Sequence, residues 1–438
     1  MKYIPRVLEP LLQNYLKKER PPFHTLLLGG ARQVGKSTLL KHLFPPSQHM
    51  HINLVEEAAF CEAIDATANF DDFTFLLQSR FDLKIGGSRA LILDEAQVSK
   101  KLGNYVRFMK EKWMNQRVII TGSTLSNLFT HTEKPTGRIV EFTLRPFNFI
   151  EFLMALGKQT MVEKLKTWNP EAPFSPTVHD EMIRFLQTYL RVGGLPSVIE
   201  AYQQKSDYLR ILANLFSFYK RDFESKLSTE NLTSIFNQVF LRIAASTGSP
   251  IKLSSIVKSS SPGYKKLRDV LSILEQWHLV IRVDCETSKL SKVGTVTPKR
   301  YIFDHGIRYL QNPARFAQAD LTDSQSSLHE DIGGLLENFI LTELLSLNGP
   351  IALRSWEKTH QSGLVDFILT HGEQAYAIEV KSANRFNQKH LSSLLAYAED
   401  FPKSHLILAN LAPGLRFKTK SEILNIPLYA LYVYLSKT

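Results

Sequence analysis

The chain has 438 residues, of which 44% are hydrophobic and 22% charged, a composition typical of a soluble globular protein with roughly three domains. It contains no apolar run long enough to span a membrane, no apolar secretory signal and only two distant cysteines, Cys61 and Cys285, so we expect a cytoplasmic protein without a zinc site or disulfide framework. The net charge of +11 favours a polyanionic partner such as nucleic acid, although the same charge could serve solubility alone.

Short apolar runs alternate with helical stretches between about residues 23 and 151. The runs are TLLLGG, MHINL, RALILDEAQ, RVIITGS and RIVEFTL. This alternation predicts βα units around a mostly parallel sheet.

The segment GGARQVGKSTLL follows the first of these strands and precedes a helix, which is the context that a P-loop requires. In such a loop the backbone N–H groups point at phosphates, the lysine reaches the β- and γ-phosphates, and the serine hydroxyl binds Mg²⁺. The segment therefore predicts an ATP and Mg²⁺ site. Its nucleotide-binding residues are Gly30, Ala31, Arg32, Gln33, Val34, Gly35, Lys36, Ser37 and Thr38.

Two acids follow the apolar strand of RALILDEAQ. We expect Asp94 to hold the magnesium ion together with Ser37, and Glu95 to polarise the attacking water. A solvated strand end is the simpler alternative for such a pair.

The P-loop followed by this acidic pair resembles the AAA+ ATPases, and more narrowly a prokaryotic AAA+ family with a second domain of poorly understood function. The resemblance implies that Ser123, or Thr121 beside it, is a polar sensor near the γ-phosphate. It also implies that Arg138, in GRIVEFTLRPFNFIEF, is an arginine finger acting on a neighbouring subunit, which would need a homo-oligomer. A strand-end cap for Ser123 and a structural surface role for Arg138 remain open.

A proline-rich stretch, TWNPEAPFSPTVHD, predicts a linker or a lid loop before a run of helical pattern. The later segment YLRVGGLPSVIEAY resembles the Gly-Gly-x-Pro turn of the same family. That resemblance implies that Gly193, Gly194 and Pro196 shape a helical lid, with Arg191 as a further candidate nucleotide sensor.

The middle of the chain predicts three helices followed by two strands with a basic loop, an order that resembles a winged helix. Basic residues occupy the third helix and the wing, and we expect them to contact DNA phosphates. A protein–protein spacer with solvated lysines is the alternative. These residues are Lys265, Lys266, Arg268, Lys289, Lys292, Lys299 and Arg300.

The last part of the chain predicts a helix, IGGLLENFILTELLSL, and then a hairpin, LVDFIL and AYAIEVK around THGEQ. Glu379 and Lys381 project to one face of their strand, and Asp366 in the paired strand can approach them. Converging carboxylates repel unless a cation lies between them, so we expect Mg²⁺ or Mn²⁺ there.

The hairpin resembles the core of the PD-(D/E)XK nucleases. The resemblance implies Glu337, with Glu343 as a weaker second, as a further metal ligand beside Asp366 and Glu379. It also implies a catalytic role for Glu379 and Lys381. Leu364 stands where the family often places another acid, and a nuclease fold retained as a scaffold with an exposed ion cluster is the alternative.

The predicted fold class is α/β. We expect a P-loop AAA+ core with a parallel sheet, a helical lid and linker, a winged helix and an α/β PD-(D/E)XK nuclease-like domain, in residues 1–165, 166–228, 229–310 and 324–438. The predicted function is hydrolysis of ATP with Mg²⁺ in order to act on DNA, with a metal-dependent nuclease domain and without a membrane partner. The alternative is an ATP-driven regulatory switch with an inert nuclease-like docking domain. A remodeller of proteins is least favoured, because no aromatic pore loop stands out.

Overall fold

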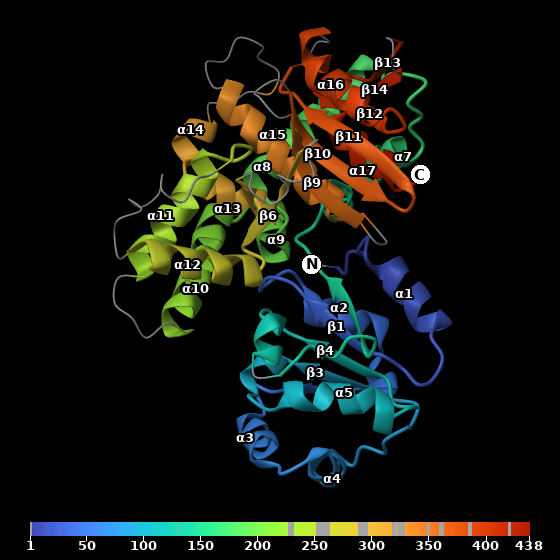
Figure 1. The fold of residues 1–438 in the computed structure, drawn as a ribbon, viewed down its shortest axis with the longest axis vertical. Helices are drawn as coiled ribbons and strands as arrows, with labels where there is room; N and C mark the ends of the chain where they lie inside the picture. Colours follow the sequence, from blue (N-terminus) through green and yellow to red (C-terminus); the bar gives the residue numbers. More distant parts are fainter. Residues whose placement is uncertain are drawn as a thin grey trace. The chain divides into compact units, whose positions relative to one another are not determined.

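A computed structural model describes most of the chain (Figure 1). The described residues are 2–130, 132–226, 232–250, 263–287, 297–317, 321, 329–347, 351–358, 363–383, 388–418 and 422–438. They fall into two compact units. Unit 1 comprises Met1–Val7, Pro146–Glu275 and Leu279–Thr438, and unit 2 comprises Leu8–Arg145 and Gln276–His278.

Unit 2 is an α/β unit. Its helices are α1 (Glu9–Lys18), α2 (Lys36–Leu43), α3 (Ala58–Ala66), α4 (Phe70–Phe81) and α5 (Leu102–Lys112). Its strands are β1 (Thr25–Gly29), β2 (His49–Asn53), β3 (Ala90–Asp94), β4 (Val118–Thr121) and β5 (Ile139–Thr143).

The strands of unit 2 form one five-stranded parallel sheet in the order β2-β3-β4-β1-β5. Every residue of β1, β3 and β4 is buried, as expected for central strands with helices on both faces. The order confirms the predicted parallel sheet. It places the carboxyl ends of β1 and β3, where the P-loop and the acidic pair begin, on the same edge.

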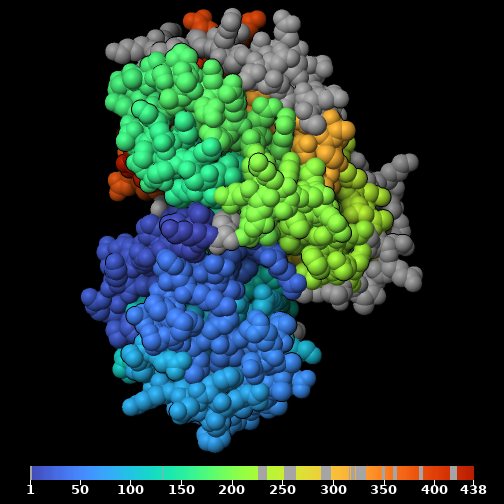
Figure 2. All heavy atoms as spheres, turned by 180° about the vertical axis from the view of Figure 1, so that it is seen from behind, coloured from blue at the N-terminus to red at the C-terminus, as the bar shows by residue number. Residues whose placement is uncertain are grey.

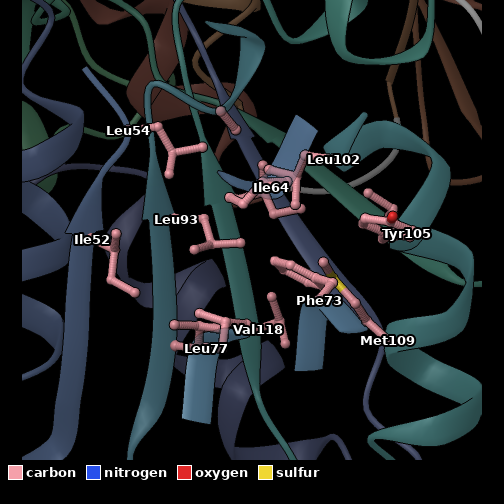
Figure 3. Close-up of a cluster of buried hydrophobic side chains, with 14 of the residues drawn as sticks. Ile52, Leu54, Ile64, Phe73, Leu77, Leu93, Leu102, Tyr105, Met109 and Val118 are labelled. Carbon is pink, nitrogen blue, oxygen red and sulfur yellow. The ribbon is translucent and has the colours of Figure 1, made fainter. Parts of the chain in front are cut away.

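Helices α3, α4 and α5 cover one face of this sheet through a continuous apolar core. Figure 3 shows side chains from strands and helices converging there, with Leu93 and Val118 from the sheet beside Phe73 and Met109 from the helices. Phe73 also stacks on Tyr105, with 5.1 Å between ring centroids. This packing gives the strand ends a rigid support.

Unit 1 holds the remaining elements. Its helices are α6 (Phe149–Ala155), α7 (Gln159–Lys166), α8 (Pro176–Val192), α9 (Pro196–Gln203), α10 (Tyr208–Lys226), α11 (Leu232–Ala245), α12 (Gly263–Gln276), α13 (His305–Leu310), α14 (Pro313–Ala317), α15 (His329–Leu344), α16 (Ser392–Asp400) and α17 (Leu431–Leu435). Its strands are β6 (Val280–Val283), β7 (Cys285–Thr287), β8 (Lys299–Ile302), β9 (Ile351–Glu357), β10 (Leu364–His371), β11 (Gln374–Val380), β12 (His405–Asn410), β13 (Leu415–Lys418) and β14 (Glu422–Pro427).

The predicted lid segment is helical. Within it, α8 and α9 each begin with a proline at a first-turn position. Helix α6, which precedes the predicted lid, begins at a capping box in which Asn148 and Glu151 satisfy each other's backbone N–H groups. Figure 2 shows the green residues of this segment and the yellow-green residues that follow forming one continuous surface of unit 1.

The middle segment contains α11, α12 and an antiparallel pair of strands, β6 and β8, in which Val280 lies opposite Ile302. Strand β7 does not join this pair and instead lies parallel to β9 in another sheet. The helix predicted from LSSIVKSS, as well as Lys289 and Lys292, lies outside the described residues. The winged helix therefore stays a prediction.

The last segment is built on a seven-stranded sheet in the order β13-β14-β12-β11-β10-β9-β7. The predicted hairpin is present as the antiparallel pair β10 and β11, joined at a turn where Gly372 has a φ of 60°. Strand β11 also pairs in parallel with β12, and α16 packs on these strands through a core that includes Trp356 and Tyr397. The hairpin thus lies inside the sheet.

None of the helices in the described ranges combines the length and the apolar character that crossing a membrane requires.

Candidate functional site

The P-loop connects β1 to α2 in unit 2, and its glycines are required by its backbone path. Gly30 has a φ of 140°, and a Cβ there would lie 2.2 Å from the carbonyl oxygen of Leu144. Gly35 caps α2 in the left-handed region with a φ of 96°. Gly30 has no room for a side chain and Gly35 has a φ that L side chains rarely adopt, so glycine at both positions lets the backbone curl around a bound group.

Lys36 is buried at the first turn of α2. Its ammonium group donates to the carbonyl oxygens of Gly30 and Ala31, at 2.9 and 3.0 Å. Burial lowers the pKa of Lys36 to about 8, while the charges of Glu95 and Asp94 act in the opposite direction. A further anion at the loop would stabilise the charged form, as expected for a phosphate-binding lysine.

Ser37 and Asp94 meet as predicted. The Ser37 hydroxyl donates to Asp94 Oδ2 at 2.8 Å, and Nε2 of His51 lies 3.2 Å from the same oxygen. Burial alone would raise the pKa of Asp94, but hydrogen bonds from His51, Ser37 and the N–H group of Glu95 lower it below its ordinary value. The carboxylate is therefore charged and oriented, and its donor chemistry fits Mg²⁺.

His51 was not predicted from the sequence. It lies on β2, the strand next to β3, and its neighbour Asn53 is in register with Asp94. One feature of the sequence could have indicated His51. It is a polar residue in a predicted strand, and that strand could lie next to the strand that carries Asp94.

Glu95 lies at the turn after β3, with a φ of 52°. Its carboxylate accepts a 2.5 Å hydrogen bond from Gln97 Nε2. A Cβ on Gly122 would lie 1.9 Å from Gln97 Oε1, so the glutamine also abuts the loop after β4. Gln97 thus links the predicted water-polarising acid to the predicted sensor loop.

The two sensor candidates differ in what they contact. Thr121 is fully buried, and its hydroxyl donates to the carbonyl oxygen of Leu28 at 3.0 Å, which ties β4 to β1. Ser123 is also buried and lies in the loop that follows β4. Because the Thr121 hydroxyl already has a hydrogen-bond partner within the sheet, Ser123 is the better candidate for the sensor of the γ-phosphate.

His278 belongs to the short segment of unit 2 at residues 276–278. Its Nε2 lies 3.7 Å from the position of a Cβ on Gly29, at the start of the P-loop. Burial, together with the charges of Arg145 and Lys36, lowers its pKa to about 4. A neutral imidazole therefore lies beside the loop, and nothing in the sequence pattern indicated it.

Arg138 precedes β5 at the surface of unit 2. Its Nε donates to Glu111 at 2.6 Å, and 43% of its side chain is exposed. This exposure is compatible with a role towards a neighbouring subunit, which stays a prediction. Arg191 occupies the last turn of α8 in unit 1, and its predicted sensor role stays a prediction as well.

The Gly-Gly turn of the predicted lid packs inside unit 1. Gly194 donates its N–H to Asp304 Oδ2 at 2.7 Å, and a Cβ on Gly194 would lie 2.3 Å from the carbonyl oxygen of Phe147. Gly193 has a φ of 81°. Burial raises the pKa of Asp304 to about 6, and the N–H donors around it act in the opposite direction. Asp304 was not among the predicted site residues.

The three predicted acids of the nuclease-like segment do converge in unit 1, around a lysine. Lys299, from β8, is wholly buried, and its ammonium group lies 2.8 Å from Glu337 Oε1 and 3.0 Å from Asp366 Oδ1. Lys381 pairs with Glu379. We call Lys299, Glu337, Asp366, Glu379 and Lys381 the buried charge cluster.

Backbone and hydroxyl donors complete the cluster. Tyr301 donates to Glu337 Oε1 at 2.6 Å, and the N–H of Val380 donates to Asp366 Oδ2 at 2.9 Å. Burial, and then the charge of Asp366, raise the pKa of Glu337 to about 7 and that of Glu379 to about 8.

This geometry corrects four expectations. Lys299 and Arg300 do not form a solvated wing, because Lys299 lies inside the cluster and Arg300 is buried with its Nε 2.9 Å from Glu275. The alternative of an exposed ion cluster is wrong for the same reason. Among the described residues, no group of three or more Asp, Glu, His or Cys side chains is arranged to hold a metal ion, so the expected site at Glu337, Asp366 and Glu379 is not formed.

The fourth correction concerns Glu343, the weaker acid on α15. Its Oε1 accepts from the N–H of Phe149 at 2.8 Å, so it caps α6 and does not join the cluster. Burial raises the pKa of Glu343 to about 8. In contrast, Lys265, Lys266 and Arg268 are exposed on α12, as contact with a polyanion requires.

Three family models match separate parts of the chain. Residues 22–153 match an AAA domain, residues 183–315 a domain of unknown function (DUF8612), and residues 332–429 another domain of unknown function (DUF4143). No curated protein matches the chain.

One similar solved structure is that of the Aeropyrum pernix Orc1 protein in complex with DNA. It is 14% identical, the match covers 71% of this chain and 91% of that chain, and the TM-score is 0.28. The AAA match, the P-loop, the acidic pair and the strand order agree with one another. Residues 22–153 are therefore similar to an AAA domain, and their P-loop, acidic pair and strand order are those expected of one.

Proposed function

We propose that the chain binds ATP with Mg²⁺ at the P-loop, hydrolyses it and uses the reaction to act on DNA. The observation that carries the proposal is the Ser37–Asp94 contact of 2.8 Å beside the buried Lys36. A hydroxyl, a carboxylate and an ammonium group at one sheet edge are the set that a magnesium-bound triphosphate requires.

Each predicted residue has a role in this scheme. The N–H groups of residues 30–38 receive the phosphates, and Lys36 moves its ammonium group from the loop carbonyls to them. Ser37 and Asp94 hold the magnesium ion, which neutralises charge that develops on the phosphates. Glu95, oriented by Gln97, polarises the attacking water.

Ser123 senses the γ-phosphate, and Arg138 contributes a positive charge to the site of a neighbouring copy. The position of Arg138 at the surface supports this role, because a finger acting across a subunit contact must be accessible. The active form would then be a homo-oligomer.

DNA engagement is supported by charge. The chain carries a net charge of +11, and the first turns of α12 expose Lys265, Lys266 and Arg268. Such residues attract phosphate without reading sequence, so we propose contacts to the DNA backbone.

The buried charge cluster favours a second function, an ATP-driven switch with a docking domain that does not cleave. Cleavage by the predicted mechanism needs a divalent ion between the carboxylates, and the ammonium group of Lys299 occupies that position. The two functions share the ATPase step and differ in whether DNA is cut.

The ATPase step is tested by hydrolysis assays on the wild type, Lys36→Ala and Glu95→Gln. We expect Lys36→Ala to lose nucleotide binding, because the phosphate partner is removed. Glu95→Gln should retain binding and lose turnover, because only the water-polarising charge is removed. Turnover that is unchanged in both folded variants would overturn the proposal.

DNA engagement is tested by the salt dependence of binding. Replacing Lys265, Lys266 and Arg268 by alanine should reduce the slope of log K against log salt by about 1 for each phosphate that is no longer bound. The matched control replaces Lys84 and Lys403, which are exposed elsewhere, and should leave the slope unchanged. Equal slopes in all three proteins would refute the assignment of α12. Cleavage is tested separately by incubating the wild type with plasmid DNA in Mg²⁺. A protein that hydrolyses ATP but cuts no DNA would favour the second function, the ATP-driven switch.

A further inference from the structure

Lys299 is buried, whereas a lysine in a solvated wing would be exposed. None of its surface is exposed, and it is in the strand that pairs with β6, opposite Val283. Its ammonium group bridges carboxylates from two separate elements, Glu337 on α15 and Asp366 on β10. A side chain of β8 therefore closes a cluster that belongs to the terminal sheet.

The surroundings hold the lysine and its partners in place. Tyr301, two residues further along β8, donates to the same Glu337 oxygen that Lys299 contacts. On the other side, Gly248 has a φ of 87°, and a Cβ there would lie 2.2 Å from Glu337 Oε2. Both contacts restrict Glu337 to an orientation that faces Lys299.

The cluster nevertheless retains an unused acceptor. Within the described part of the chain, Glu379 Oε2 is buried and has no hydrogen-bond partner, whereas Oε1 of the same residue pairs with Lys381. A buried carboxylate oxygen without a donor is costly, because it has lost water and gained nothing in exchange. This oxygen would serve a cation that enters the cluster.

The distances from the Lys299 ammonium nitrogen to the two carboxylates describe direct contacts. Separations of 2.8 and 3.0 Å are those of a charged N–H···O hydrogen bond. Bound Mg²⁺ or Ca²⁺ lies roughly 2.0–2.6 Å from its oxygen ligands. A divalent ion at the same place would have to displace the ammonium group, which would then be left buried without a partner.

We propose that Lys299 is the resident cation of the buried charge cluster, and that the cluster accepts a divalent ion only when Lys299 is withdrawn. The entry path lies at Lys381, whose side chain is 35% exposed, unlike the other members of the cluster. This inference does not depend on the proposed ATPase.

The test measures Mn²⁺ binding in the absence of nucleotide by electron paramagnetic resonance. All proteins carry Asp94→Asn, which removes the predicted metal ligand of the P-loop site. With Lys299 in place we expect no Mn²⁺ bound at the cluster. Lys299→Met keeps an unbranched side chain one atom shorter, without the charge, and should bind about one Mn²⁺ per chain.

Two variants show where the ion binds. Adding Glu379→Gln to Lys299→Met should abolish the additional Mn²⁺ binding, because it removes charge from the carboxylate oxygen that has no hydrogen-bond partner. Lys265→Met removes a lysine from the exposed face of α12 and should leave Mn²⁺ binding as in the parent protein. A folded Lys299→Met protein that binds no more Mn²⁺ than its parent would overturn the proposal.

A second measurement covers the case in which Lys299→Met does not fold without metal. Its thermal unfolding is followed with and without millimolar Mn²⁺, and we expect the ion to restore a cooperative transition that metal-free buffer does not support. The parent protein gives an independent outcome. If it binds Mn²⁺ and loses this ion on Glu379→Gln substitution, Lys299 does not exclude a divalent ion and the proposal is wrong.

Discussion

Removing the charge of Lys299 is expected to destabilise the hairpin of β10 and β11 more than any surface charge change. The side chain is fully buried and bridges Glu337 and Asp366, so Lys299→Met leaves two carboxylates without their cation. Breaking a buried ion pair in this way costs about 3–5 kcal/mol. The destabilisation should appear locally, because the N–H of Val380 donates to Asp366.

Hydrogen exchange of a peptide that covers β11 reports this destabilisation. Since each 1.4 kcal/mol corresponds to about a tenfold change in an equilibrium constant, protection of Val380 should fall by about 100-fold or more. Exchange is followed in metal-free buffer, so that no added ion can replace the lysine.

A compensated variant separates the effect of charge balance from the effect of packing. Lys299→Met combined with Glu337→Gln and Asp366→Asn removes the cation and its two counter-charges, and replacement of a whole buried pair is often close to neutral. We expect most of the protection to return. Protection that is unchanged in Lys299→Met, or equally low in the compensated variant, would refute the charge argument.

Three further predictions concern other parts of the chain. Burial raises the pKa of Glu343 to about 8, so the folded state holds a proton that the unfolded state releases, and stability falls as pH rises from about 4.5 to about 8. Glu343→Gln should remove this fall and raise the urea midpoint at pH 8 but not at pH 4. Gly194→Ala should lower the melting temperature because its Cβ meets backbone, whereas Gly333→Ala, where a Cβ meets nothing within 4 Å, should raise stability by about 0.5–1 kcal/mol. His51→Ala should lower Mg²⁺-dependent ATP hydrolysis by about 10–100-fold with little change in KM, because His51 positions Asp94.

Each of these has a result that would count against it. A pH profile of stability with the same slope in Glu343→Gln and wild type would mean that another group causes the slope. Equal melting temperatures for the two glycine variants would show that the structure around Gly194 can relax. Unchanged turnover in His51→Ala would remove His51 from the site.

The geometry of the P-loop could be predicted because its residues are contiguous in sequence and its path depends on the backbone. A strand, a glycine loop and a helix start fix where Lys36 and Ser37 lie, and the strand order then brings Asp94 to them. His51 and Gln97 escaped prediction because their positions follow from sheet register and turn conformation, which the motif does not specify.

In the terminal segment, the sequence predicted the strands but not all of the contacts between their charged side chains. The hairpin and the convergence of Asp366, Glu379 and Lys381 were predicted correctly, since alternation along paired strands determines them. The contact of Lys299 with these acids was not predicted, because Lys299 comes from a strand that the sequence pattern assigned to a different domain. The basic residues of the predicted wing look alike in the sequence, so nothing indicated that Lys299 is buried.

The proposed function requires the P-loop of this chain to bind a magnesium-bound triphosphate. Isothermal titration of ATP with Mg²⁺ into the folded wild type and into Lys36→Ala measures it directly. We expect saturable binding of about one nucleotide per chain in the wild type and none in the variant. A wild type that releases no heat at several temperatures, or a folded Lys36→Ala protein that binds equally well, would contradict it.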